Sequence, residues 1–226
     1  MVAFRHKKSK YAGTVPQAII TAVAVLLSVV SFGWNTECEL ETDASLAIAS
    51  SERLLDSEFT NKLSIAIASS NKMLKVDAEL VQSIVCFQQF QDTADGRFVD
   101  FEVASLCNAV NLTSAMTNAW QFWTARMLLA CAYAADNNFK DSYRVCTNCI
   151  AKIQNAGKGL ESNKLSMAIL SYYEMPDIDV ATAFKVLAGS AAACMGQGSS
   201  AIKYSNQVPA KYKAIILEIL ESKMRE

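Results

Sequence analysis

One uncharged stretch near the start of the chain, residues 16–34, constrains the fold more than any other feature. Its sequence is PQAIITAVAVLLSVVSFGW, and no charged residue occurs between Lys10 and Glu37. The hydrocarbon core of a bilayer is roughly 30 Å thick and is crossed by about 20 apolar residues in a helix. We therefore predict that residues 16–34 form a transmembrane helix, and that the rest of the chain is held at a membrane.

The charges on either side of this stretch predict its orientation. Four basic residues precede it: Arg5, Lys7, Lys8 and Lys10. The first charged residues that follow it are acidic. Because Lys and Arg beside a membrane segment stay on the cytoplasmic side, we expect residues 1–15 to form a basic cytoplasmic tail. Residues 35–42 would then be a linker, and residues 43–226 a domain on the periplasmic or extracytoplasmic side of a single-pass membrane protein.

A cleaved signal peptide is the alternative interpretation of the same stretch. A basic region followed by an apolar segment is typical of both. The nearest cleavage site of the small-x-small type is Ser31-Phe32-Gly33, and the bulky Trp34 follows it. This site is a poor one, so we favour the retained anchor.

The composition of the exported domain predicts an all-α fold. The chain of 226 residues has only three prolines and eight glycines, which favours helices with short connections. No alternating apolar and polar run is bounded by hairpin turns. Apolar spacing predicts helices at residues 43–56, 60–74, 77–91, 98–110, 115–135, 139–156, 160–173, 179–195, 199–207 and 209–224, with Asp77 as the cap of the third.

The charge of the exported domain excludes one class of partner. Without the four basic residues of the tail, 17 Lys and Arg stand against 22 Asp and Glu, which gives a net charge of about −5. A net charge of this sign argues against nucleic acid or an anionic surface as partner. We therefore expect protein or peptide partners, contact with the bilayer through residues 16–34, and no nucleic acid.

The exported domain contains no histidine, the general base of the common nucleophilic catalytic sites. His6, the sole histidine, lies in the tail, which excludes catalysis by a Ser-His-Asp or Cys-His arrangement. Phosphate loops and dinucleotide fingerprints are absent, and no pair of acidic residues stands in a marked apolar context. We expect no enzymatic activity, no cofactor and no metal.

Seven cysteines leave a redox alternative open: Cys38, Cys86, Cys107, Cys131, Cys146, Cys149 and Cys194. Disulfide connectivity cannot be read from their spacing. The only C-x-x-C is Cys146-Thr-Asn-Cys149, and a reactive pair of this type has its first cysteine at a helix N-terminus. Cys146 falls about two turns into its predicted helix, so we favour packing over redox chemistry.

Residues 125–150, ARMLLACAYAADNNFKDSYRVCTNCI, resemble a tetratricopeptide repeat. Leu129-Ala130 corresponds to the pair at which the two helices of a repeat cross closely. The other matching positions are an aromatic residue, a turn residue, the residue after the turn and two small residues: Tyr133, Asn137, Phe139, Ser142 and Cys149. Asn137 replaces the usual glycine, and asparagine tolerates the left-handed conformation expected there.

A second, weaker match begins 59 residues later and keeps the small pair, the turn glycine and a helical alanine: Ala188-Gly189, Gly196 and Ala201. This distance is not a multiple of the 34-residue repeat. The helices between the two matches are therefore expected to be atypical. The resemblance implies stacked helical hairpins, in an α-solenoid, and no catalytic residues.

The whole layout is similar to the bacterial single-pass ancillary subunit of the Sec translocon. The shared features are a membrane helix ending in Gly33-Trp34, a tetratricopeptide-like domain, and the C-terminal order of small pair, turn glycine, alanine and final helix. This resemblance implies contacts with translocon-associated periplasmic chaperones.

Three aromatic residues of the predicted helix 115–135 are candidates for partner binding: Trp120, Trp123 and Tyr133. Aromatic side chains are favoured anchors in interfaces, although residues at this helical spacing more often belong to a core. We expect a membrane-anchored scaffold for protein–protein interaction in the cell envelope, ancillary to protein export. The alternatives are a structural component of a secretion or pilus-like apparatus, and a thiol redox protein using Cys146 and Cys149.

Overall fold

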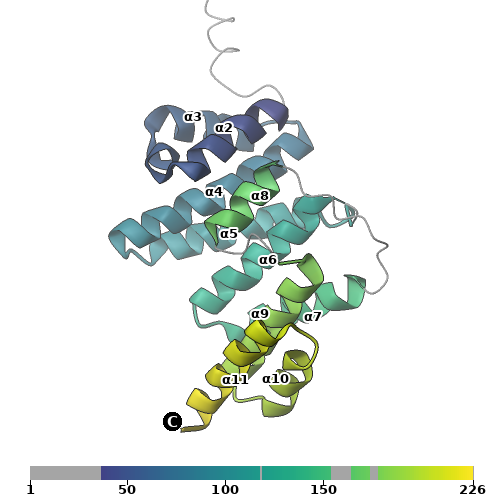
Figure 1. Cartoon of the computed structure of the whole chain (residues 1–226). Coiled ribbons are helices and arrows are strands. Elements are labelled where there is room, and N and C mark those ends of the chain that lie inside the picture. The colour runs from purple at the N-terminus through teal and green to yellow at the C-terminus, as the bar shows by residue number, and fades with distance from the viewer. Residues whose placement is uncertain (1–36, 118, 154–163, 174–177, 226) are drawn as a thin grey trace, which may run out of the picture.

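The computed structural model describes residues 37–117, 119–153, 164–173 and 178–225. In these ranges all regular secondary structure is helical, with ten α-helices and one 3-10 helix, which confirms the all-α prediction (Figure 1). The elements are α2 (Glu37–Ala49), η1 (Ser51–Leu55), α3 (Ser57–Ile67), α4 (Lys72–Thr93), α5 (Arg97–Leu112), α6 (Trp120–Ala135), α7 (Phe139–Ile153), α8 (Lys164–Tyr172), α9 (Val180–Cys194), α10 (Gly198–Ser205) and α11 (Ala210–Arg225).

The predicted tail and transmembrane helix, residues 1–34, lie outside the described residues. The helices that are described are each too short or too polar to cross a bilayer. The N-terminal anchor, its orientation and the signal-peptide alternative therefore stay predictions.

The helices form a stack of hairpins that runs from α2 and α3 at one end to α10 and α11 at the other (Figure 1). Short loops join α4 to α5, α6 to α7 and α9 to α10, and the members of each pair pack on one another. Packed helices joined by a short loop run antiparallel. Successive pairs then touch, because α5 packs on α6 and α7 packs on α9.

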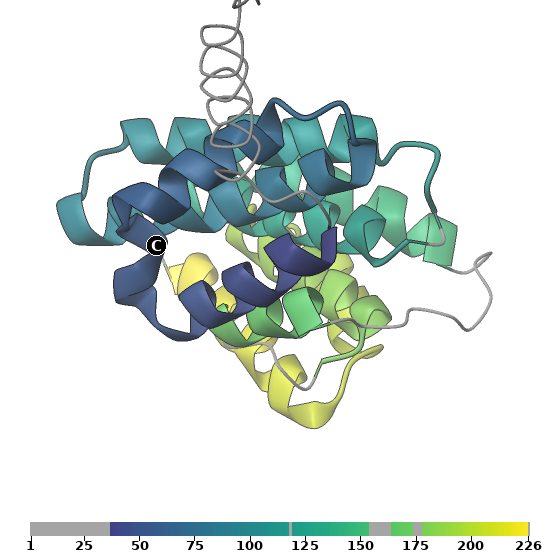
Figure 2. The ribbon, with the colours of Figure 1, turned by 90° about the horizontal axis from the view of Figure 1, so that it is seen from above.

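Helix α8 leaves this stack and lies along α2 (Figures 1 and 2). As a result, α7 packs on α9 and not on α8, which is the next helix in the chain. The two repeat-like matches are 59 residues apart, which exceeds a 34-residue repeat by about 25 residues. Within the described residues between the two matches, α8 is the helix that belongs to neither match, and it packs on α2.

Several helix boundaries differ from the prediction. Helix α2 begins at Glu37, inside the stretch expected to be a linker. Helix α3 ends at Ile67, and Asn71 caps α4 by accepting from the backbone N–H of Met73 (3.0 Å) and Leu74 (3.3 Å). The prediction that Asp77 caps this helix is wrong. An earlier residue with a capping side chain starts the helix, and the later acid is taken inside it.

Two turns of the stack have the same geometry. Asn137 (φ 58°) and Gly196 (φ 70°) are both left-handed, which confirms the expectation for Asn137. In both turns the following N–H donates to the carbonyl five residues earlier, from Asn138 to Tyr133 (2.8 Å) and from Gln197 to Ala192 (2.9 Å). These are Schellman motifs, which satisfy the last carbonyls of a helix.

The small residues of the two matches lie where helices approach closely. The Ser142 hydroxyl donates to the carbonyl of Ala130 over 2.8 Å, from α7 to α6. A Cβ on Gly189 would lie 2.7 Å from Cδ1 of Ile216 and 3.3 Å from Cβ of Tyr204. Glycine is therefore the residue that lets α10 and α11 pack on α9.

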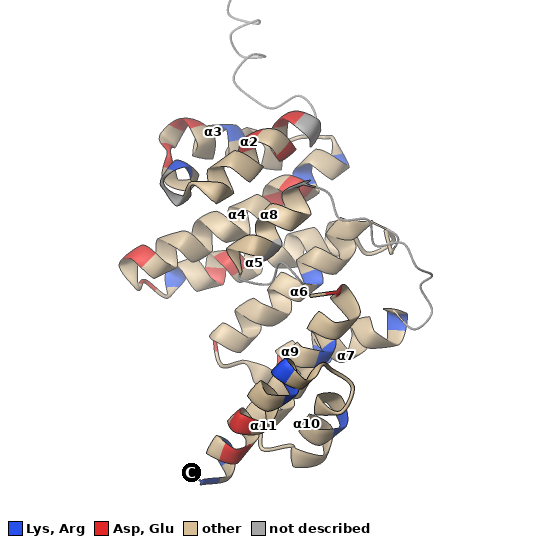
Figure 3. Cartoon of the chain, viewed as in Figure 1, with Lys and Arg blue, Asp and Glu red and all other residues tan. Residues whose placement is uncertain are grey.

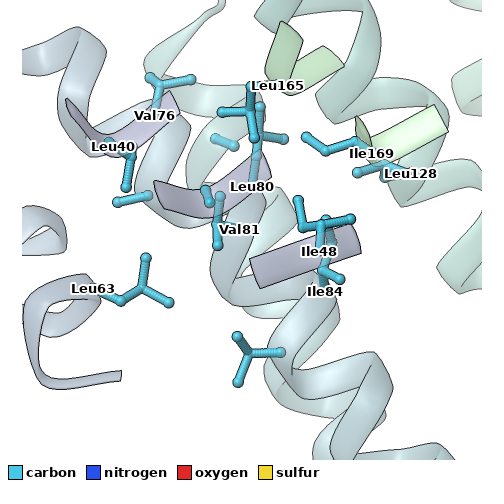
Figure 4. Close-up of a cluster of buried hydrophobic side chains, with 14 of the residues drawn as sticks. Leu40, Ile48, Leu63, Val76, Leu80, Val81, Ile84, Leu128, Leu165 and Ile169 are labelled. Carbon is cyan, nitrogen blue, oxygen red and sulfur yellow. The ribbon is translucent and has the colours of Figure 1, made fainter. Parts of the chain in front are cut away.

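The largest core cluster joins α8 to the N-terminal half of the stack (Figure 4). It combines side chains of α2, α4, α6 and α8, among them Leu40, Ile48, Leu80, Ile84, Leu128, Leu165 and Ile169. Leu165 and Ile169 are fully buried. Burial of a leucine-sized side chain stabilises the fold by roughly 1.5–3 kcal/mol, so α8 is held firmly on α2.

Candidate binding groove

A groove with a cavity volume of about 530 Å³ lies between α5, α6 and α7. Volumes of about 300–1,000 Å³ are usual for binding sites. Apolar and polar side chains from three helices line it: Val110, Arg126, Leu129, Arg144, Val145, Asn148, Cys149, Ala151 and Lys152. Three of these residues are basic and none is acidic. The groove is therefore an electropositive site with an apolar wall.

Arg126 of α6 is half-buried in this groove. It donates hydrogen bonds to the carbonyls of Phe122 (2.9 Å) and Val110 (3.2 Å) and to the Thr113 hydroxyl (3.1 Å). Its guanidinium carbon also lies 3.5 Å from the centre of the Phe122 ring. The bonds to Val110 and Thr113 fasten α6 to the end of α5, so the guanidinium is held in place.

The partners of Arg126 among the described residues are neutral. Two are carbonyls, one is a hydroxyl and one is an aromatic ring. Burial lowers the pKa of Arg126 from its ordinary value, although a guanidinium stays charged at neutral pH. A positive charge without a carboxylate is thus exposed to whatever enters the groove.

The two other cations of the groove come from α7 (Figure 3). The Lys152 ammonium is exposed and lies 5.1 Å from the centre of the Phe122 ring, the same ring that Arg126 covers. Arg144 is exposed and pairs with Asp141 over 2.9 Å. Exposed ion pairs of this kind contribute about 0–1 kcal/mol, so Arg144 can exchange Asp141 for another anion at little cost.

The aromatic residues predicted to bind a partner do not form one surface. Trp123 is only 2% exposed; it packs between Phe122 and Phe184, and its indole N–H donates to the carbonyl of Thr117 over 3.1 Å. Trp120 and Tyr133 are half-buried against the largest core cluster, the one that joins α8 to α2, α4 and α6. Thirteen residues of helix separate these two, which is roughly 20 Å. The structure therefore places Trp123 in the core and keeps the other two apart.

The thiols of Cys146 and Cys149 are buried inside α7. Burial raises the pKa of Cys149 to about 11 and that of Cys146 well above its ordinary value. A reactive cysteine needs a lowered pKa and an accessible sulfur. Both residues, with the other cysteines whose side chains are described, are free thiols. The described part of the chain holds no group of three side chains suited to a metal ion.

Buried acids are present that the sequence analysis missed. Glu102 is 2% exposed and Glu79 is 3% exposed, and the sequence analysis singled out neither of them. Burial raises the pKa of Glu102 to about 7 and also raises the pKa of Glu79. The sequence does contain a signal for the burial of Glu102. Three buried residues follow it at steps of three, four and seven, on the same face of α5: Ser105, Leu106 and Ala109.

The basic groove was also missed, and only part of it has a sequence signal. Arg144, Asn148 and Lys152 recur every four residues and so share one face of α7. Arg126 and Val110 come from other helices, and their place beside that face depends on how the helices pack. Comparisons of the chain with protein-family models, with curated proteins and with solved structures give no match.

Proposed function

We propose that this chain is a membrane-anchored helical-repeat protein of the tetratricopeptide type that acts as a scaffold for protein–protein interaction in the cell envelope. The hairpin stack, the Schellman turns at Asn137 and Gly196, and the close crossing at Gly189 support the repeat assignment. Stacked helical hairpins present rigid, extended surfaces to partners.

The observation that carries this proposal is the groove between α5, α6 and α7. Its walls are helices fixed by packing, and it combines three cations with the apolar side chains of Val110, Leu129 and Val145. Protein interfaces combine an apolar centre with polar and charged groups in this way. The groove therefore suits a segment of another polypeptide.

The membrane part of the proposal rests on the sequence. Residues 16–34 have the length and hydropathy of a membrane span. Anchoring a binding domain raises its effective concentration near membrane partners. A role ancillary to protein export, with the domain outside the cytoplasm, follows from the resemblance in layout to the Sec translocon subunit. The burial of Cys146 and Cys149 gives no support to the redox alternative.

An exchange of the anchor tests this function against a structural role of the membrane helix. In the full chain, residues 16–34 are replaced by an unrelated membrane helix, and chemically crosslinked complexes are purified from membranes. The proposal predicts that the same partner is recovered with the exchanged anchor. Loss of the partner on exchange would place the contact in the membrane helix, and would favour a structural component of a larger apparatus.

A further inference from the structure

We infer that the groove between α5, α6 and α7 takes an acidic segment of a partner polypeptide, in which carboxylates flank an apolar side chain. This inference rests on the proposed scaffold function and names the chemistry of the partner.

Arg126 brings a fixed positive charge to the groove. A guanidinium has five N–H donors, and three hydrogen bonds of Arg126 go to neutral acceptors. These bonds use both donors of Nη1 and one of Nη2, which leaves Nε–H and one N–H of Nη2. A guanidinium binds a carboxylate more strongly than a neutral acceptor. An incoming carboxylate therefore finds a fixed cation with spare donors.

The walls of the groove carry further positive charge. Lys152 and Arg144 add two cations, and none of the described residues that line the groove is acidic. The other notable pocket, of about 250 Å³ between α2, η1 and α3, differs in this respect. Its acids Asp43, Asp56 and Glu58 accompany the cations Arg53 and Lys62, and Lys62 pairs with Glu58 over 2.9 Å. The groove therefore selects for negative charge, whereas the smaller pocket does not.

The size and position of the groove favour a polypeptide over a small anion or a lipid headgroup. A small anion would cover the cations and leave the apolar wall of Val110, Leu129 and Val145 in water, whereas a peptide with an apolar side chain between carboxylates covers both. A lipid headgroup fits the position less well. The predicted anchor precedes α2, and the groove lies further along the stack, on α5 to α7 (Figure 1). A polypeptide is the occupant that satisfies charge, wall and position together.

Peptide binding to the full chain in non-ionic detergent micelles tests this inference. The probe is a fluorescein-labelled peptide, EELEELEE, with QQLQQLQQ as its neutral analogue, and anisotropy gives the Kd. We expect the acidic peptide to bind and the neutral analogue not to bind. Binding is expected to weaken as salt rises to about 0.5 M, because surface charges are screened.

Substitution of the exposed cations locates the site. Two exposed ion pairs of about 0.5 kcal/mol each correspond to a loss of roughly five-fold in affinity for Arg144→Gln/Lys152→Gln. Lys140→Gln on the same helix is the matched control, because Lys140 is exposed and does not line the groove, and we expect no change in Kd. Arg126→Gln should abolish binding, but it also removes bonds between α6 and α5, so the double variant decides.

Three results would overturn the inference. They are equal binding of the neutral peptide, unchanged affinity of the double variant, and displacement of the acidic peptide by phosphatidylglycerol added to the micelles. The last would assign the groove to lipid headgroups. Recovery of a partner with the exchanged anchor, combined with any of these results, would show that the scaffold function stands and that this groove is not its acidic-segment site.

Discussion

The hydroxyl of Tyr173 donates a hydrogen bond to Oε1 of Glu102 over 3.2 Å, and these residues are 71 positions apart in the chain. Tyr173 directly follows α8, and Glu102 belongs to α5. The adjacent Tyr172 hydroxyl donates to Oε1 of Gln88 on α4 over 2.8 Å. The end of the helix that leaves the stack is thus tied back to the stack through a buried acid.

We predict that this buried acid makes stability depend on pH. Burial raises the pKa of Glu102 from 4.5 to about 7, although the hydrogen bond from Tyr173 lowers it. The Glu102 carboxylate in turn raises the pKa of Tyr173, Tyr172, Cys86 and Cys131. Between pH 4.5 and about 7 the folded chain binds more protons than the unfolded chain. The free energy of unfolding should therefore fall as pH rises from about 5 to above 7, by up to about 3 kcal/mol.

Thermal unfolding of the full chain in detergent, followed by circular dichroism at pH 5 and pH 8, measures this effect. Glu102→Gln keeps the shape and removes the titration, so most of the pH dependence should disappear and the variant should be the more stable protein at pH 8. A smaller fall in stability with rising pH should remain in this variant, because the pKa of Glu79 is also raised. A wild-type chain equally stable at both pH values would contradict the prediction.

Because Gly189 is closely packed, we predict that adding one methyl group at this position lowers the free energy of unfolding. In Gly189→Ala the new Cβ would lie 2.7 Å from Cδ1 of Ile216, at a buried position and against a fully buried side chain. Overpacking of this kind costs typically 1–3 kcal/mol. Gly198→Ala is the matched control, because its Cβ would meet only Leu220 Cδ2 at 4.0 Å. Partial rescue by Ile216→Val would confirm the cause; equal melting temperatures of the two alanine variants would refute it.

The left-handed turn at Asn137 predicts how the wild-type chain and its glycine and alanine variants at this position rank in stability. Its φ of 58° costs an ordinary side chain about 1–2 kcal/mol, whereas glycine adopts it freely. Asn137→Gly should leave the free energy of unfolding unchanged or raise it slightly, and Asn137→Ala should lower it by about 1 kcal/mol. Urea denaturation of the three proteins gives the order, and an alanine variant as stable as the glycine variant would be inconsistent with a left-handed turn.

The burial of the Cys146 and Cys149 thiols predicts low reactivity. Because burial raises the pKa of Cys149 to about 11, its thiolate fraction at pH 8 should be at least about two orders of magnitude lower than in the unfolded chain. Iodoacetamide labelling followed by mass spectrometry compares the folded protein with the protein in guanidinium. Rapid labelling of Cys149 in the folded protein would reopen the redox alternative.

Features set by neighbouring residues were predictable from the sequence. The left-handed turn at Asn137, the hairpin it closes and the small residue at Ser142 all depend on chemistry within a few positions. The sequence did not show which of two possible capping residues starts α4. Asn71 and Asp77 both suit a helix cap, and only the structure shows that Asp77 is buried and accepts from the Gln121 amide over 3.1 Å.

Features that depend on which surfaces meet were not predictable. The apolar spacing of Leu165 and Ile169 indicates that α8 buries one face, but not that this face packs on α2. Trp123 likewise has a spacing that suits either a groove or a core, and the structure places it in the core. The groove needs Val110, Arg126 and Arg144 from three helices, so it exists only once these helices have packed.

The most direct test of the binding-scaffold account is photocrosslinking in intact membranes. A photoreactive residue at Asn148, in the groove, is compared with one at the exposed Ser199 on α10 and one at Val25 in the predicted membrane segment. The account predicts a discrete protein adduct from position 148 that Arg144→Gln/Lys152→Gln weakens, and no such adduct from position 199. Adducts from position 25 alone, or an adduct from position 148 that the double variant leaves unchanged, would contradict it.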